Sequence, residues 1–286
     1  MFSNTNSFNP YRGSGGPEAG YVTERLIDDA ARLLDLDPVE IRRRNLIADG
    51  ALPYTNALGY TYDSGAFERL METTIDMADR GEFNKRREDA ERRGRRLGFG
   101  LANAIKKTSI PVMESARVRF DASGTVTLLI GTISHGQGHE TMYKQVLSDR
   151  LGLAAADIRI VEGDTDLTGV GSGTSGSRSA ALGGTVCVMA CDKIIDKGKT
   201  IAGHLLEAST EDVAFNDGVF TIIGTDRAVT LSDVASTAFA VQRLGPGIEP
   251  GLDESASFVP DDQNWASTCH ACEAEVDPET ETIVTL

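Results

Sequence analysis

The chain has 286 residues, of which 40% are hydrophobic and 25% charged, a balance that favours globular domains with buried cores over disorder. Acidic residues outnumber basic ones by 43 to 28, so the net charge of −15 argues against nucleic acid and anionic membranes as partners. No stretch approaches the roughly 18 uninterrupted apolar residues of a membrane span, and the N-terminal residues lack the apolar core of a secretion signal. We therefore expect a cytoplasmic protein whose four cysteines are reduced.

The first part of the chain is predicted to be helical. Apolar residues recur at helical spacing over residues 18–34, and Asp37 is a typical N-cap residue for a second helix that ends near residue 46. A third helix is expected to begin at Ser64, and a charged fourth helix to cover residues 84–96. We interpret residues 1–96 as a mainly helical segment.

Strand patterns begin near residue 97. Apolar and charged residues alternate over residues 116–120, and a Ser-Gly turn separates them from the apolar run 126–130, which predicts a β-hairpin. Further elements follow: helices over 141–151 and 180–207, a strand at 158–161, a hairpin over 213–223, a helix capped near Ser232, and a final hairpin over 273–286. The stretch 245–263 is expected to be a linker. Residues 97–286 therefore read as an α+β segment, and the fold class as α+β with mixed sheets and helices.

Three glycine-containing loops each lead into a predicted helix: residues 11–18, 134–141 and 169–179. Glycines let the backbone approach a ligand closely, and a helix N-terminus favours negative charge, so three such loops indicate a large phosphorylated ligand. Taken singly, each loop is equally well explained as a tight turn. Three glycines of the third loop match the dinucleotide pattern G-x-G-x-x-G, but no strand directly precedes them, which disfavours a conventional NAD site.

Longer motifs resemble one family. The segments GTISHGQGHETMYKQ (131–145), VEGDTD (161–166) and GSGTSGSRSAALGG (171–184) resemble the large-subunit signatures of molybdenum hydroxylases, which include xanthine dehydrogenases and aldehyde oxidoreductases. Residues 11–34 and 271–286 resemble two other segments of that subunit, in the same order. The resemblance covers nearly the whole chain, and it implies an internal fragment from the central part of a molybdenum-binding large subunit.

The resemblance implies molybdopterin carrying one molybdenum, in the cytosine dinucleotide form that is usual in bacterial members. Gly136, Gln137 and Gly138 would lie against the pterin and near the metal, without ligating it directly; alternatively, Gln137 caps the next helix. The dinucleotide end would be held by Gly173, Thr174, Gly176, Ser177, Arg178 and Ser179. Arg178 would bind phosphate, or it merely forms a salt bridge.

Arg12 is the candidate on the substrate side, because the resemblance places this arginine at the pocket, where it can stabilise developing negative charge. Its alternative role is to pin the loop to a carboxylate. Gly13 stands where carbon monoxide dehydrogenases carry a copper-binding cysteine, which disfavours carbon monoxide oxidation and suggests greater similarity to the xanthine and aldehyde branch. The family's general-base glutamate belongs to a GxGE loop, and this sequence has no such motif.

The implied activity is hydroxylation of aldehydes or of N-heterocycles, purines included, with water as the oxygen source. Iron–sulfur clusters and FAD are expected on an iron–sulfur subunit and a FAD-binding subunit, and the missing segments of the large subunit would complete the site around a small-molecule substrate. Two other hypotheses stay open: a catalytically inactive, truncated cofactor-binding or structural remnant, and an unrelated nucleotide-binding protein.

Two short motifs carry less weight. Cys269, His270 and Cys272 form half of a possible metal site, but neighbouring residues of a strand face opposite sides, so cysteines packed in a sheet are favoured. His139 and Glu140 belong to the first family motif, and neither has an assigned role.

Overall fold

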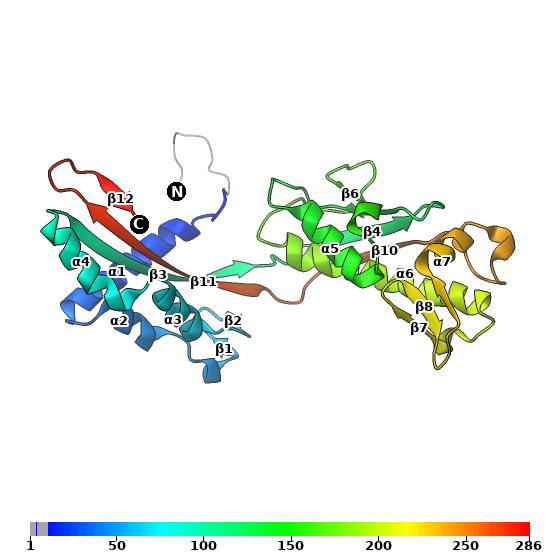
Figure 1. The fold of residues 1–286 in the computed structure, drawn as a ribbon, viewed down its shortest axis with the longest axis horizontal. Coiled ribbons are helices and arrows are strands. Elements are labelled where there is room, and N and C mark those ends of the chain that lie inside the picture. Colours follow the sequence, from blue (N-terminus) through cyan, green and yellow to red (C-terminus); the bar gives the residue numbers. More distant parts are fainter. Residues whose placement is uncertain (1–3, 5–10) are drawn as a thin grey trace. The chain divides into compact units, whose positions relative to one another are not determined.

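The computed structural model describes Asn4 and residues 11–286, which divide into two compact units (Figure 1). Unit 1 comprises Met1–Lys107 and Asn264–Leu286, and unit 2 comprises Thr108–Gln263. Unit 2 is thus a continuous segment inserted between the two parts of unit 1. The predicted division at residue 96, between a mainly helical segment and an α+β segment, stays a prediction.

The four helices predicted in unit 1 are present, with some shifts at their ends. They are α1 (Gly16–Leu33), α2 (Pro38–Asn45), α3 (Phe67–Met77) and α4 (Phe83–Arg92). Asp37 caps α2 as predicted, because its carboxylate accepts a hydrogen bond from the backbone N–H of Val39 at 2.7 Å.

Two helix boundaries differ from the prediction. Ser64 does not cap α3, whose N-cap residue is Ala66; its hydroxyl instead donates to the carboxylate of Asp63. Helix α4 ends before residue 96, because Gly94 has a positive φ of 74° and Arg96 already belongs to a strand. At the start of α3 a local side-chain contact replaces the predicted cap, and at the end of α4 a glycine in the left-handed conformation stops the helix earlier than predicted.

Two small sheets complete unit 1. Their strands are β1 (Tyr54–Thr55), β2 (Thr61–Tyr62), β3 (Arg96–Thr108), β11 (Asn264–Val276) and β12 (Ile283–Thr285). The antiparallel pairing of β11 with β12 confirms the predicted final hairpin, and β3 lies on the other side of β11. The helices bury two apolar clusters: Val39, Met71 and Leu101, and Phe83, Ala90 and Leu97.

A four-stranded sheet is the framework of unit 2. In spatial order its strands are β10 (Asp253–Phe258), β4 (Glu114–Phe120), β5 (Val126–Ile130) and β6 (Ile158–Glu162). The antiparallel pairing of β4 with β5 confirms the predicted hairpin. Strand β10 corrects the expectation of a linker over 245–263, because it pairs with β4 along its length. Only Ala256 and Phe258 of β10 add apolar side chains to the core. The strand therefore lacks a clear alternation of apolar residues, and the surrounding Gly, Pro and Asp residues resemble a linker.

Strands β5 and β6 run parallel, and helix α5 (His139–Leu151) connects them. Gly152 ends α5 with a φ of 66°, as predicted. After β6, a glycine-rich loop leads through a π-helical turn at Ser179–Gly183 into α6 (Gly184–Leu205), which confirms the long predicted helix apart from its first turn. Because the two strands are parallel, the loops that follow them leave the same edge of the sheet.

A three-stranded antiparallel sheet and a short helix follow α6. They are β7 (Val213–Asn216), β8 (Val219–Ile222), β9 (Ala228–Thr230) and α7 (Leu231–Ala238). The pairing of β7 with β8 confirms the predicted hairpin. Thr230 caps α7, which corrects the prediction of Ser232; its hydroxyl accepts from the N–H of Asp233 at 3.1 Å, and Asp233 accepts from the N–H of Thr230.

One core fills unit 2. Helix α6 packs against α5, β4 and β10, and these elements bury a continuous apolar cluster that reaches α7 and β8 (Figure 1). Helices and mixed sheets thus confirm the α+β fold class. Within the part of the chain that the structure describes, no helix is both long and apolar enough to cross a bilayer.

None of the four cysteines is paired in a disulfide in the structure. Cys187 and Cys191 are buried on α6, and burial raises the pKa of both thiols, that of Cys191 to about 12. Because the thiolate is the reactive form, we expect iodoacetamide to label exposed Cys272 in the folded chain and the two α6 cysteines only after unfolding. Mass spectrometry of the peptides measures this, and labelling of Cys187 without denaturant would contradict the packing of α6.

Candidate functional site

Two of the predicted cofactor loops lie at one edge of the unit 2 sheet. One follows the carboxyl end of β5, and the other follows the carboxyl end of its parallel neighbour β6. In proteins with parallel sheets, ligands commonly bind at the carboxyl ends of the strands, where loops and helix N-termini present backbone N–H groups. The two loops contain all the predicted cofactor-binding residues: Gly136, Gln137, Gly138, Gly173, Thr174, Gly176, Ser177, Arg178 and Ser179.

The loop around Gln137 is exposed and left-handed at its glycines. Gly136 and Gly138 have φ values of 92° and 82°, and no atom lies within 4 Å of the position that a Cβ would take on either. Oε1 of Gln137 accepts a hydrogen bond from the backbone N–H of His135, and its Nε2 lies 2.8 Å from Nε2 of His139. Helix α5 has Gly138 as N-cap and no side-chain cap, so the alternative that Gln137 caps it is wrong.

A chain of side-chain hydrogen bonds begins at this loop. His139 is only 3% exposed, and its Nδ1 lies 2.7 Å from Oε1 of Glu162 at the end of β6. The same carboxylate oxygen accepts from the hydroxyl of Thr132 at 2.6 Å, and the Thr132 oxygen lies 3.0 Å from the hydroxyl of Tyr143. The ends of β5 and β6 are thus joined through buried polar groups.

The chain continues into the second loop. The Tyr143 hydroxyl lies 3.2 Å from the carbonyl oxygen of Ser179, and burial raises the pKa of this phenol, so it stays a neutral donor. Because the Thr132 hydroxyl already donates to Glu162, Tyr143 shares its single proton between the Thr132 oxygen and this carbonyl oxygen. The Ser179 hydroxyl lies 3.2 Å from that of Thr174, which accepts from the backbone N–H of Ile133 at 3.0 Å. Two predicted residues of the second loop are therefore tied to the first.

Arg178 is buried beneath the second loop. Its Nη2 donates to the carboxylate of Glu114, and the side chains are 1% and 0% exposed. Burial raises the pKa of Glu114, against the effect of the Ser115 backbone N–H and of Arg178. Nε and Nη1 of Arg178 are also buried and have no partner among the described residues. Both readings of Arg178 therefore stay open, because it forms the salt bridge and keeps donors free for an anion.

Two glycines hold the second loop against the end of β5. A Cβ on Gly171 would lie 2.3 Å from the Cα of Gly131, and a Cβ on Gly131 would lie 2.4 Å from the Cα of Gly171. Neither glycine has a positive φ, so the reason for a glycine at each position is the close approach of the two backbones, which leaves no room for a Cβ atom. The close packing of Gly171 against Gly131 therefore accounts for this glycine, without a dinucleotide-binding motif.

Arg12 belongs to unit 1, in the turn before α1. It is exposed, and the described residues show no ion pair between Arg12 and a carboxylate, so its alternative role of pinning the loop also stays a prediction. Lys106 contacts this loop, with its Nζ donating to the carbonyl oxygen of Gly13 at 2.7 Å. Gly13 has a φ of 100°, and a Cβ there would lie 2.7 Å from the ring of Pro17, so a cysteine would require this turn to change. The substrate role of Arg12 stays a prediction.

The motif around Cys269 does not bring its possible metal ligands together. No cluster of three or more possible ligands occurs among the residues that the structure describes. Cys269 is half-buried and packs beside the core of unit 1, whereas His270 and Cys272 are exposed on β11. The favoured expectation of buried cysteines holds only in part for Cys269, which is half-buried, and is wrong for Cys272, which is exposed.

The residues of the unit 2 edge fit an anionic ligand bound through backbone groups. Helix α5 and the π-helical turn before α6 both begin without a side-chain cap, which leaves N–H groups of their first turns available. Open space surrounds Gly136 and Gly138, and Arg178 carries buried donors without a partner in the described chain. A pterin with phosphate groups meets these requirements.

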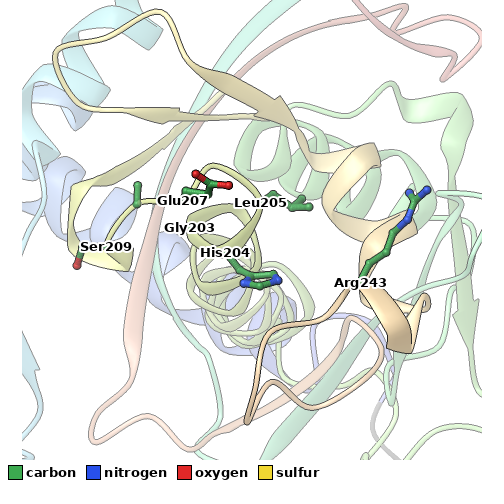
Figure 2. Close-up of a pocket in the computed structure, with 7 residues that line it drawn as sticks. Gly203, His204, Leu205, Glu207, Ser209 and Arg243 are labelled. Carbon is green, nitrogen blue, oxygen red and sulfur yellow. The ribbon is translucent and has the colours of Figure 1, made fainter.

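An open hollow lies elsewhere in unit 2, at the carboxyl end of α6. Figure 2 shows His204 and Glu207 at the end of this helix and Arg243 on a separate helical turn. Its lining residues are Gly203, His204, Leu205, Glu207, Ala208, Ser209 and Arg243. None of the predicted site residues lines this hollow, so the glycine loops remain the candidate site.

Family comparison agrees with that choice. A family model described as a molybdopterin cofactor-binding domain matches residues 74–286, and a second model with the same description matches residues 1–46. The chain belongs to the molybdopterin cofactor-binding domain family. This confirms the predicted resemblance to the large subunits of molybdenum hydroxylases and, at the level of the molybdopterin and its molybdenum, the predicted cofactor.

Similar proteins are named as hydroxylases and dehydrogenases. The large subunit of nicotine 6-hydroxylase from Paenarthrobacter nicotinovorans is 32% identical over 94% of this chain and 35% of that protein. The carbon monoxide dehydrogenase large chain of Hydrogenophaga pseudoflava is 31% identical over 91% of this chain and 34% of that protein. The structure of quinoline 2-oxidoreductase from Pseudomonas putida 86 matches with a TM-score of 0.87 and 33% identity, over 96% of this chain and 37% of that one.

The comparisons also correct one expectation. A xanthine dehydrogenase molybdenum-binding subunit from Escherichia coli O157:H7 is 28% identical over 83% of this chain and 32% of that protein. Identity to the carbon monoxide dehydrogenase chain is higher, so the expected greater similarity to the xanthine branch is wrong. The chain spans about a third of the length of the curated relatives named here.

Sequence reasoning missed the polar residues that hold the two loops together. No local motif assigns a role to these residues, which are Glu114, Thr132, His139, Tyr143 and Glu162. The available signal was a polar residue at the end of each apolar strand: Thr132 lies just after β5, and Glu162 ends β6. Such positions lie at the ligand-binding edge of a parallel pair.

Proposed function

We propose that this chain forms the cofactor-binding part of a molybdenum hydroxylase that acts on N-heterocycles, purines included, or on aldehydes, with water as the oxygen source. The observation that carries the proposal is the meeting of two family motifs at the carboxyl edge of β5 and β6. A series of hydrogen-bond contacts links the two motifs, from His139 through Glu162, Thr132 and Tyr143 to Ser179. Similarity to nicotine 6-hydroxylase and quinoline 2-oxidoreductase supports the N-heterocycle class. The glycine at position 13 disfavours oxidation of carbon monoxide.

In this proposal the two loops bind different parts of the cofactor. Gly136, Gln137 and Gly138 would bind the pterin near the metal, with the Gln137 amide as hydrogen-bond donor. The second loop would hold a cytosine dinucleotide through backbone N–H groups, hydroxyls and the free donors of Arg178. When bound, the cofactor supplies the two-electron chemistry of hydroxylation. Arg12 would steady negative charge on the substrate.

The rest of the enzyme is proposed to come from outside these residues. No glutamate of the chain lies in a GxGE motif, so the general base would belong to further segments of the large subunit. The cysteines are too few for the ligands of two iron–sulfur clusters, which we place on an iron–sulfur subunit, with FAD on another subunit. The relative from Paenarthrobacter nicotinovorans, named as a large subunit, supports such an assembly.

The test is the molybdenum and released cytidine nucleotide content of the chain, purified from a host that makes the cofactor. We expect near-stoichiometric metal in the native chain and about a 10-fold loss in Gln137→Ala. Gln145→Ala is the matched control, because this glutamine is exposed on α5 away from the loop, and it should retain the cofactor.

Each other result has a definite meaning. Equal metal in the native chain and Gln137→Ala would contradict the role of Gln137. Metal without cytidine nucleotide would support molybdopterin and contradict the dinucleotide form. If neither appears, even when the remaining large-subunit segments and partner subunits are co-expressed, the inactive remnant is the better description.

A further inference from the structure

We propose that His139 and Glu162 are positioning residues, which hold the carboxamide of Gln137 in one orientation through a single tautomer of the His139 imidazole. This inference rests on the proposed role of Gln137 and deepens it. The decisive contacts are Gln137 Nε2 to His139 Nε2 at 2.8 Å and His139 Nδ1 to Glu162 Oε1 at 2.7 Å.

The hydrogen-bonding capacity of each group leaves one assignment. The carboxamide nitrogen of Gln137 can only donate, so Nε2 of His139 must accept and carry no proton. Carboxylate oxygens can only accept, so Nδ1 of His139 must carry the proton that it donates to Glu162. The neutral Nδ1–H tautomer therefore satisfies both contacts.

The other protonation states break at least one contact. With the proton on Nε2, two donors face each other at Gln137 and two acceptors face each other at Glu162. With both nitrogens protonated, Gln137 must rotate its amide to offer Oε1, which removes the acceptor of the His135 N–H. The geometry thus relates the orientation of Gln137 to the proton position on His139.

The surroundings of Glu162 keep this arrangement in place. The side chains of His139 and Glu162 are 4% and 12% exposed, so an unpaired group there would be costly. Thr132 donates to the same oxygen of Glu162 at 2.6 Å, so two donors hold this carboxylate oxygen in place. Within the described chain, one N–H of Gln137 is left without an acceptor and is available to the cofactor.

The test reads the tautomer directly, in the full chain without cofactor. Two-bond proton–nitrogen correlation spectra distinguish protonated from unprotonated imidazole nitrogens. We expect His139 to show one tautomer, with the proton on Nδ1, and the exposed His135, His204 and His270 to serve as internal references. A His139 that carries its proton on Nε2 would overturn the proposal.

Three variants separate positioning from packing. Glu162→Leu removes the acceptor and should convert His139 to a mixture of tautomers. Glu162→Gln keeps an oxygen that can accept from His139 and Thr132, so we expect His139 to carry its proton on Nδ1, as in the native chain. If Glu162 acted only through its negative charge, Glu162→Gln would behave like Glu162→Leu. Glu140→Leu is the matched control, because Glu140 is exposed, adjoins His139 in sequence and pairs with Lys144. An unchanged tautomer in Glu162→Leu would refute the link.

Cofactor content tests whether His139 acts through Gln137. We expect Glu162→Leu to retain about 10-fold less molybdenum than the native chain, and the double variant Gln137→Ala/Glu162→Leu to retain as much as Gln137→Ala alone. Additive losses would contradict action through Gln137. If the native chain binds no molybdenum even when the remaining large-subunit segments and partner subunits are co-expressed, the proposed function fails, while the tautomer spectra still decide the role of His139.

Discussion

Replacing Arg178 with methionine is expected to destabilise unit 2 by about 3–5 kcal/mol, because it leaves the fully buried carboxylate of Glu114 without its cation. Burial already raises the pKa of Glu114, and loss of Arg178 raises it further. The variant should therefore be least stable at neutral pH and recover as the pH falls, since protonated Glu114 carries no charge to bury. Hydrogen exchange of the amides in β4 and α6, measured by mass spectrometry, reports this stability.

A double variant separates structure from ligand binding. Arg178→Met/Glu114→Leu removes both charges and should regain most of the lost stability. If Arg178 also binds the cofactor phosphates, this refolded double variant still retains little cytidine nucleotide. Full nucleotide retention would assign Arg178 to the salt bridge alone, and a double variant as unstable as Arg178→Met would contradict the argument about the buried charge.

Replacing Gly171 with alanine is expected to displace the second loop from the end of β5. The new Cβ would lie 2.3 Å from the Cα and 2.8 Å from the carbonyl oxygen of Gly131, and backbone atoms cannot move aside as a flexible side chain can. Overpacking of this kind costs about 1–3 kcal/mol. Because the loop carries Thr174 and Arg178, we also expect cofactor content to fall more steeply than stability.

Gly169 provides the control within the same loop. Its φ is not left-handed, and the nearest atom to an added Cβ is Oγ of Ser115 at 3.7 Å, so Gly169→Ala should be almost neutral. The two alanine variants are compared by thermal unfolding and by molybdenum content after purification. Similar behaviour of the two would show that the contact between Gly131 and Gly171 does not hold the loop.

Local sequence patterns predicted the elements well, because their causes are local. Helical spacing of apolar residues located α1, and the N-cap Asp37, whose carboxylate acts only two residues away, located α2. Alternation located the hairpin of β4 and β5, and Gly152 ended α5 as its conformational freedom suggests. Prediction failed for β10, because this strand is defined by its pairing with β4 and not by an apolar pattern of its own.

The sequence by itself determined the family and the three glycine loops, because motifs of consecutive residues carry that information. Only the tertiary structure decided what those residues contact. The parallel pairing of β5 and β6 brings Gln137 and Ser179 to one edge, although about 40 residues separate them in the chain. The partners of Arg178 and His139 are Glu114 and Glu162, and such distant pairs follow from strand order and register, which no local pattern specifies.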